Sequence, residues 1–259
     1  MKKTTLLFAM ALGAAFTPAM DVAASPAAPA AMMAIDPAAI LAEVDKRAAA
    51  FDDQSYTATM QIYKEGALKK TLVFFAVMKG LDKQFIEFVA PGDVAGMKVL
   101  LEGGDANNLY LYVPEFKKVR RVAAHMQNQG FMGSELNLSD MIVEMAPYYD
   151  ATIAKSEGSL TELVLTTKAG KETAYPKISL TIDGSKGGVT QLVYFDGSGA
   201  EVRKQQRDEW VKIDGKLVPT KISMTNLKTK DVTVITMSEI KVNQGVGDDL
   251  FSRRNLLRE

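Results

Sequence analysis

Cysteine is absent from this chain of 259 residues, and histidine occurs once, as His125. Without cysteine the protein can have neither a disulfide framework nor a lipid-modified N-terminal cysteine. No G-x-S-x-G, Walker A, dinucleotide or H-E-x-x-H motif accompanies the histidine. We therefore expect no catalytic residue, no metal site and no cofactor, and we predict that the protein is not an enzyme.

The chain also lacks an excess of either basic or acidic residues. The chain has 31 Lys and Arg and 31 Asp and Glu, so its formal net charge is zero. A nucleic-acid-binding domain usually carries a clear positive excess, and we therefore expect no nucleic-acid partner. The apolar run Leu6–Phe16 is shorter than the roughly 20 residues that a membrane-spanning helix needs, and no later run is long enough. The protein is predicted not to span a membrane.

The N-terminus has the pattern of a signal peptide. Two lysines precede the apolar run, and the small residues Val22, Ala23 and Ala24 follow it. Cleavage after Ala24 without a lipid anchor predicts export to the periplasm. The predicted organisation is a signal peptide at 1–24, a disordered Ala/Pro-rich tether at 25–35, and one domain at 36–259.

The remainder indicates a mainly β protein. Asp36 followed by Pro37 predicts the start of a helix, with Asp as N-cap and Pro at the first helical position. About eleven or twelve strands follow, separated by turns such as Asp183-Gly184, with one further short helix over 139–146 capped by Ser139. So long a meander must curl to cover its apolar face. We therefore predict an antiparallel half-open β-barrel, with a few short helices forming a lid over an apolar cavity.

Residues 109–140 carry the strongest functional signal. An alternating strand is followed by a basic strand and then by a Gly-containing flap. This pattern indicates a recognition surface. The side chains predicted to line the cavity or its flap are Leu109, Leu111, Val113, Phe131, Met132, Met141, Met145, Leu163, Leu165 and Leu180. Lys118, Arg120 and Arg121 are predicted to contact head groups, the lid or a partner, or else to form a solvated, protective edge.

Several segments carry a family resemblance. They are LYLYVP at 109–114, KVRRV at 118–122, GFMGSE at 130–135, LSDM at 138–141 and DLFSRRNL at 249–256. Together they resemble the outer membrane lipoprotein-sorting protein family, relatives of the lipoprotein carrier LolA. The resemblance implies an apolar cavity for the acyl chains of lipoproteins or lipids, and shuttling between an inner-membrane transporter and an outer-membrane acceptor. Arg120 and Arg121 are the candidates for the lid lock of that family.

Two other functions remain open from the sequence. The protein could be a non-catalytic accessory or scaffold subunit that docks on an envelope or export complex through its basic strand. It could also be an esterase that uses Ser134 and His125, although Ser134 does not lie in a nucleophile-elbow motif.

Overall fold

The computed structural model describes residues 36–103, 108–123, 130–141 and 143–258. The predicted signal peptide at 1–24, the predicted tether at 25–35 and His125 lie outside the described residues. Their assignment, and that of residues 36–259 to one domain, stays a prediction.

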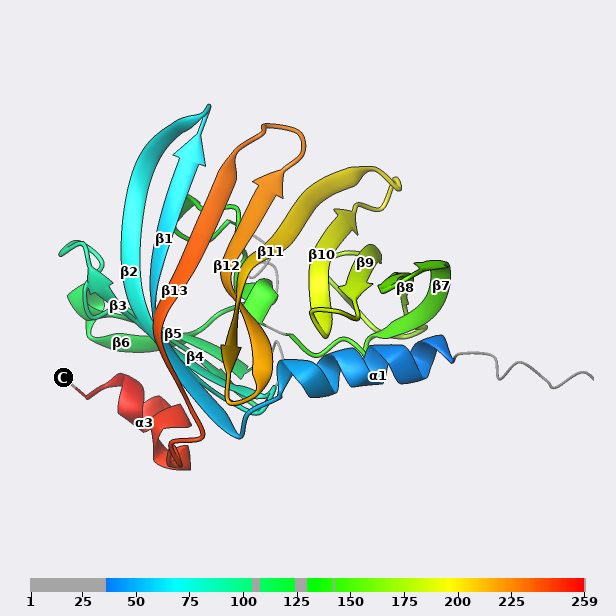
Figure 1. Ribbon diagram of the computed structural model, residues 1–259. Helices are drawn as coiled ribbons and strands as arrows, with labels where there is room; N and C mark the ends of the chain where they lie inside the picture. The colour runs from blue at the N-terminus through cyan, green and yellow to red at the C-terminus, as the bar shows by residue number, and fades with distance from the viewer. Residues whose placement is uncertain (1–35, 104–107, 124–129, 142, 259) are drawn as a thin grey trace, which may run out of the picture. The chain divides into compact units, whose positions relative to one another are not determined.

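One antiparallel sheet of thirteen strands dominates the described part of the chain (Figure 1). Its strands are β1 (Asp53–Lys64), β2 (Ala67–Lys79), β3 (Lys83–Ala90), β4 (Lys98–Glu102), β5 (Leu109–Val113), β6 (Lys118–Arg121), β7 (Tyr149–Glu157), β8 (Leu160–Thr167), β9 (Lys177–Asp183), β10 (Gly188–Phe195), β11 (Glu201–Ile213), β12 (Lys216–Asn226) and β13 (Val232–Val242). The sheet curves but does not close. The predicted half-open antiparallel barrel with a few short helices is confirmed, with thirteen strands instead of eleven or twelve.

The order of the strands explains how the concave side becomes covered. It runs β6-β5-β4-β3-β2-β1-β13-β12-β11-β10-β9-β8-β7, so the first and last strands pair in the middle of the sheet. The two edges, β6 and β7, follow one another along the chain. The residues that join them must therefore bridge both edges. We call residues 130–141 and 143–148 of this connection the cover segment.

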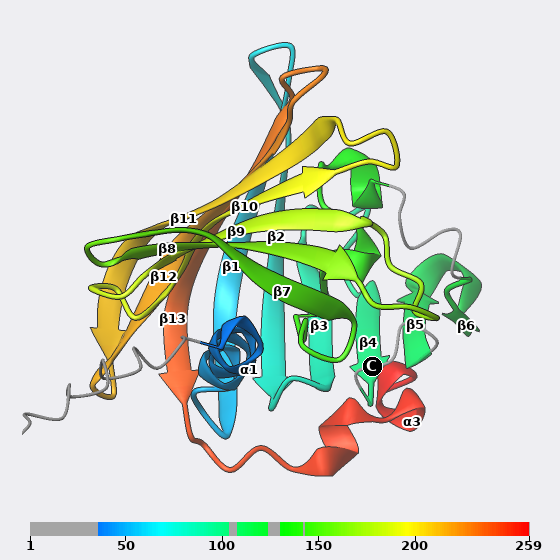
Figure 2. The ribbon, with the colours of Figure 1, turned by 90° about the vertical axis from the view of Figure 1, so that its right-hand side faces the viewer.

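Helix α1 (Pro37–Ala48) begins as the sequence predicts. The Asp36 carboxylate accepts a hydrogen bond from the amide of Ala38 at 2.9 Å, and Pro37 occupies the first turn. Figure 2, which looks along the helix, shows α1 on the concave side of the sheet. Leu41 is buried there among the side chains of the β8–β10 region.

The predicted helix at 139–146 is wrong. The chain forms only a 3-10 turn, η4 (Leu138–Met141), within the cover segment, which also contains the 3-10 turn η3 (Phe131–Gly133). Ser139 does not cap it, because its hydroxyl is buried without a hydrogen-bond partner. Asp140 instead accepts a hydrogen bond from the amide of Asn137 at 2.7 Å. Bonds between the cover segment and the sheet, described below, take the place of helical ones.

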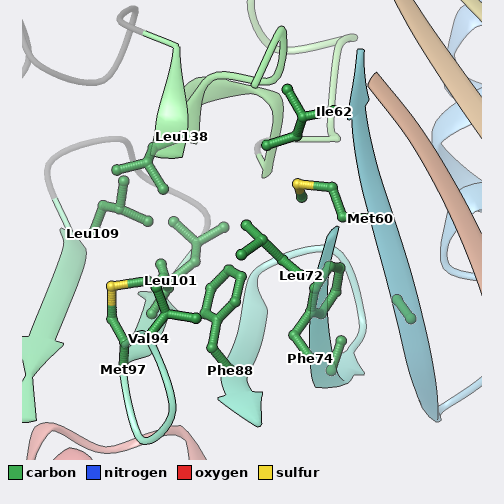
Figure 3. Close-up of a cluster of buried hydrophobic side chains, with 13 residues drawn as sticks. Met60, Ile62, Leu72, Phe74, Phe88, Val94, Met97, Leu101, Leu109 and Leu138 are labelled. Atoms are coloured by element: carbon green, nitrogen blue, oxygen red, sulfur yellow. The ribbon is translucent and has the colours of Figure 1, made fainter. Parts of the chain in front are cut away.

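Two apolar cores fill the concave side. At the β1–β5 end, Leu138 of the cover segment joins a cluster that includes Phe88 and Leu109 (Figure 3). At the β7–β10 end, the cluster forms under α1. The space between these two ends, under α1 and the cover segment, contains the cavity described below.

A third core lies on the other face of the sheet. The turn η5 (Asp248–Phe251) and the short helix α3 (Arg253–Leu256) place Phe251 and Leu256 against Val77 and its neighbours. The carboxylate of Asp53 holds the chain that leads there, accepting hydrogen bonds from the amides of residues 244, 245 and 246 at 2.8–2.9 Å. β2 is therefore covered on both faces at Ala76 and Val77, whose side chains point to opposite sides and are both buried. It is not covered along its whole length, since Phe75 is 39% exposed.

Candidate functional site: a cavity under the cover segment

A cavity of about 720 Å³ lies between the concave face of the sheet, α1 and the cover segment. Its size falls within the range of roughly 300–1,000 Å³ that small-molecule sites occupy. Most of the lining is apolar. From the sheet come Met60, Phe74, Met78, Ile86, Phe88, Val99, Ile222, Ile235, Met237 and Ile240; from α1 come Ile40 and Val44; and from the cover segment come Phe131, Leu136, Leu138, Met141, Val143 and Met145.

Strand alternation selects these side chains. In β1, Tyr56 and Met60 line the cavity, whereas the threonines at 57 and 59 between them do not. Burial raises the pKa of Tyr56 to about 12, so its hydroxyl stays neutral in the physiological range. The result is a wall with few charges.

An ion pair fastens the cover segment to β11. Arg203 and Asp140 approach at 2.7 Å, and their side chains are only 8% and 12% exposed. The guanidinium of Arg203 also donates to the Tyr175 hydroxyl and to the carbonyl of Glu135. Burial alone would lower the pKa of Arg203, but the charges and hydrogen bonds of Asp140 and Tyr175 together outweigh it and raise that pKa above its ordinary value. Arg203 thus holds two points of the cover segment, five residues apart, against the sheet.

A second group of bonds holds Glu135. Its carboxylate pairs with Lys64 of β1 and accepts a hydrogen bond from Asn226 at 3.1 Å. Its amide donates to the hydroxyl of Thr233 at 2.8 Å. Lys64 also pairs with Asp231 at 3.2 Å. Burial would lower the pKa of Lys64, but the hydrogen bonds and charges of the two carboxylates raise it.

Helix α1 is joined to the far end of the cover segment. The carboxylate of Asp45, which is 5% exposed, accepts hydrogen bonds from the amides of Met145 at 3.0 Å and Ala146 at 2.7 Å. Burial raises the pKa of Asp45, and these two bonds offset only part of that increase. The helix and the cover segment therefore act as one lid over the cavity.

The polar part of the lining includes a guanidinium on β11. Arg207 lines the cavity and donates through Nε to the side-chain oxygen of Gln205 at 2.9 Å. Burial lowers the pKa of Arg207. Trp210 also lines the cavity, and its indole N–H donates to the carbonyl of Arg207 at 3.1 Å. The single tryptophan of the chain is therefore joined to the backbone of Arg207 and lines the same cavity.

Three of the predicted site residues line the cavity. They are Phe131, Met141 and Met145, all on the cover segment. The Phe131 ring packs against Phe88 with centroids 5.8 Å apart. Met132, whose backbone has φ of 58°, is directed into the packed cluster at the β1–β5 end instead of the cavity lining.

The other predicted apolar residues lie outside the lining. Leu109 is buried in the core at the β1–β5 end, with Leu111 packed against it, and Val113 is partly exposed at the end of β5. Leu163, Leu165 and Leu180 lie on the concave face, as their alternation predicts, but the cluster that contains Leu41 of α1 covers them. They therefore contribute to the core that supports the lid.

The predicted cationic residues lie far along the sheet from the lid contacts. Lys118, Arg120 and Arg121 are exposed on β6, an edge strand, and none lines the cavity. The guanidinium of Arg120 stacks over the Phe116 ring at 5.6 Å. Among the described residues, Arg203 of β11 forms an ion pair with the cover segment, and the predicted contacts of Lys118, Arg120 and Arg121 stay a prediction. Nothing in the sequence of β11 distinguishes Arg203, because charged and polar residues occupy both faces of its N-terminal half.

The described residues show no arrangement typical of catalysis. Ser134 is 3% exposed, and its hydroxyl donates to the carbonyl of Phe131 at 2.6 Å. Within these residues, no group of three or more His, Asp or Glu side chains could hold a metal ion. No described helix is long and apolar enough to cross a membrane.

The fold has clear relatives among solved structures. A DUF1329 family protein from Desulfovibrio piger matches with a TM-score of 0.77 and 25% identity, over 85% of this chain and 99% of that one. A domain described as an outer membrane lipoprotein-sorting protein, from Vibrio parahaemolyticus, matches with a TM-score of 0.71 and 20% identity over 84% and 98%. A LolA superfamily protein from Nitrosomonas europaea gives 0.71 and 18% over 86% and 100%.

These likenesses define the class: the chain has a LolA-like fold, and the predicted resemblance is confirmed. A family model described as "Uncharacterized protein" matches residues 80–258, and the chain belongs to that family. No curated protein matches the sequence.

Proposed function

We propose that the protein is a periplasmic carrier that binds the acyl chains of lipoproteins or lipids in the cavity and shuttles them between the inner and outer membranes. The observation that supports this most directly is the cavity itself. It is apolar, about 720 Å³ in volume, and covered by a lid that a few polar contacts hold in place. The LolA-like fold is consistent with it.

The energetics suit a carrier. Each buried CH₂ group contributes roughly 0.8 kcal/mol, so an acyl chain gains about as much in an apolar cavity as in a bilayer. The free energy of moving the chain between a bilayer and the cavity is then close to zero, whereas its transfer into water is strongly unfavourable. Methionines such as Met60, Met78 and Met237 in the wall can adapt to chains of different shape.

The lid provides a route for entry. Its contacts to the sheet include ion pairs and hydrogen bonds at Asp140 and Glu135, which can exchange with water, beside the apolar packing of residues such as Leu138. We infer that partial release of the cover segment opens the cavity. An inner-membrane transporter as donor and an outer-membrane acceptor complete the proposal.

The direct test is to extract the purified protein with organic solvent and to identify acylated molecules by mass spectrometry. Saturable binding of a fluorescent acyl lipid should accompany their presence. Ile222→Asp places a charge in the cavity wall outside the packed clusters and should weaken binding by about tenfold or more. Val211→Asp is the matched control, since Val211 lies on the neighbouring strand, is 41% exposed and does not line the cavity. Folded protein that neither carries nor binds an acylated molecule would refute the proposal.

A scaffold function has one supporting observation, the exposed cations on edge strand β6. Reversing Arg120 and Arg121 to glutamate should abolish capture of an envelope partner if the protein is an accessory subunit. Acyl-lipid binding should then be unaffected by those changes, and the Ile222→Asp change should leave partner capture intact.

A further inference from the structure

A cation without a counter-ion inside an apolar cavity needs an explanation. Within the described residues Arg207 forms no ion pair, and its one hydrogen-bonded nitrogen is the Nε that donates to Gln205. Its two terminal amino groups have no hydrogen-bond partner there. Arg207 is partly buried in the cavity wall, and a guanidinium that loses hydration without gaining a counter-ion is destabilising.

The other charged groups of the lining are already satisfied. Asp140 pairs with Arg203 at 2.7 Å, and Glu43 pairs with Arg47 at 3.1 Å. Lys216 donates to the carbonyl of Ala50 at the end of α1. Asp36 and Lys216 of the lining have no counter-ion either, but both are exposed, whereas Arg207 is partly buried in the cavity wall. Arg207 is therefore the partly buried charge of the described lining that no opposite charge compensates.

The register of the sheet extends an apolar row from this cation. Arg207 of β11 lies opposite Ile222 of β12, which lies opposite Ile235 of β13, which lies opposite Met60 of β1. All four line the cavity. With strands about 4.8 Å apart, the row extends for about 14 Å across the sheet. One charged end followed by an apolar track is the complement of an amphiphile with an anionic head.

We propose that Arg207 anchors the carboxylate or phosphate head group of an amphiphilic ligand whose acyl chain lies along Ile222, Ile235 and Met60. A guanidinium matches either group with two parallel hydrogen bonds, and it has two amino groups available for them. Burial lowers the pKa of Arg207, but a guanidinium stays charged at physiological pH. This inference rests on the proposed carrier function and narrows its cargo to acidic lipids.

The experiment compares three ligands that share one chain and differ in the head: dodecanoate, dodecyl phosphate and dodecan-1-ol. Calorimetry on the full chain should show that the two anions bind about 10- to 100-fold more tightly than the alcohol, as expected for a desolvated charge-assisted hydrogen bond. The order of the two anions distinguishes a carboxylate head from a phosphate head. Quenching of Trp210 fluorescence gives an independent measure of occupancy.

Substitutions test whether the tighter binding of the anions depends on Arg207. Arg207→Met should remove the advantage of the anions and leave the affinity for dodecan-1-ol within about twofold, since the apolar row is intact. Arg207→Lys should keep part of the advantage, because it retains the charge but not the paired geometry. Lys204→Met is the matched control, since Lys204 lies on the same strand but does not line the cavity, and it should change nothing.

The possible results separate the two proposals. If the alcohol binds and the anions bind no better, or if their advantage survives in Arg207→Met, the anchor is refuted while the carrier function stands. If none of the three ligands binds the folded wild-type protein, the carrier function itself is refuted.

Discussion

The ion pair between Arg203 and Asp140 allows a quantitative test of how the lid is held. Both side chains are nearly inaccessible, so removing one leaves the other buried without its counter-charge. Such a loss typically costs about 3–5 kcal/mol. Since small proteins are usually stable by about 5–15 kcal/mol, the single variants should still fold.

The two partners should not cost the same. In Asp140→Ala, Arg203 keeps its bonds to the Tyr175 hydroxyl and the Glu135 carbonyl, so we expect a loss of about 3 kcal/mol. In Arg203→Met, all of these bonds disappear and Asp140 retains the amide of Asn137, so we expect about 5 kcal/mol. The double variant should resemble Arg203→Met instead of losing about 8 kcal/mol, because it leaves no buried charge unpaired.

Urea unfolding followed by Trp210 fluorescence and by near-ultraviolet circular dichroism measures all four proteins of this cycle. Lys221→Met with Glu209→Ala provides the matched control, because that exposed pair at 2.9 Å should couple by less than about 1 kcal/mol. Strict additivity of the Asp140 and Arg203 changes, or a loss below about 1 kcal/mol for Asp140→Ala, would show that the ion pair does not hold the cover segment.

Further predictions concern the support of the sheet. Asp53→Asn should lower the free energy of unfolding by about 1–2 kcal/mol at neutral pH, because the three backbone amides lose a charged acceptor. Burial would raise the pKa of Asp53, but these amides and the charge of Lys79 together outweigh it and hold that pKa below 3.8. The stabilisation by the ionised carboxylate is therefore complete above pH 3.8. The difference in free energy of unfolding between wild type and Asp53→Asn should disappear as the pH falls through the lowered pKa. A difference that stays constant in acid unfolding curves would contradict this. Leu180→Ala should cost about 2–5 kcal/mol in urea unfolding, because Leu180 is fully buried under α1, whereas Leu160→Ala, at a residue 48% exposed, should cost less than about 1 kcal/mol. Equal losses would mean that the core under α1 does not support the sheet.

Much of the fold was predictable from neighbouring residues alone. The alternation in Leu109–Val113 predicts a strand with one apolar face, and Asp36 followed by Pro37 predicts the start of α1. Both depend on local geometry, the period of a strand and the capping of a helix. The predicted helix at 139–146 failed because the bonds that satisfy this segment come from distant residues, among them Arg203 and Asp45.

The cavity wall was predictable only in part for a related reason. An apolar side chain on the concave face can meet either the cavity or another element, and alternation does not distinguish the two. Leu163, Leu165 and Leu180 meet the cluster around Leu41 of α1. The sequences of these strands do not predict that α1 packs over them; this contact is seen only in the tertiary structure.

The sequence by itself determined the strands, the start of the helix and the absence of familiar catalytic motifs, because each depends on residues close together in the chain. The tertiary structure alone decided that β1 pairs with β13, which leaves β6 and β7 at opposite edges and brings the cover segment across the concave face. It also brought Asp140 to Arg203 and aligned Arg207 with Ile222, Ile235 and Met60. Polar residues occupy both faces of the N-terminal half of β11, so only the folded structure shows that Arg207 is the cation of this strand that lines the cavity.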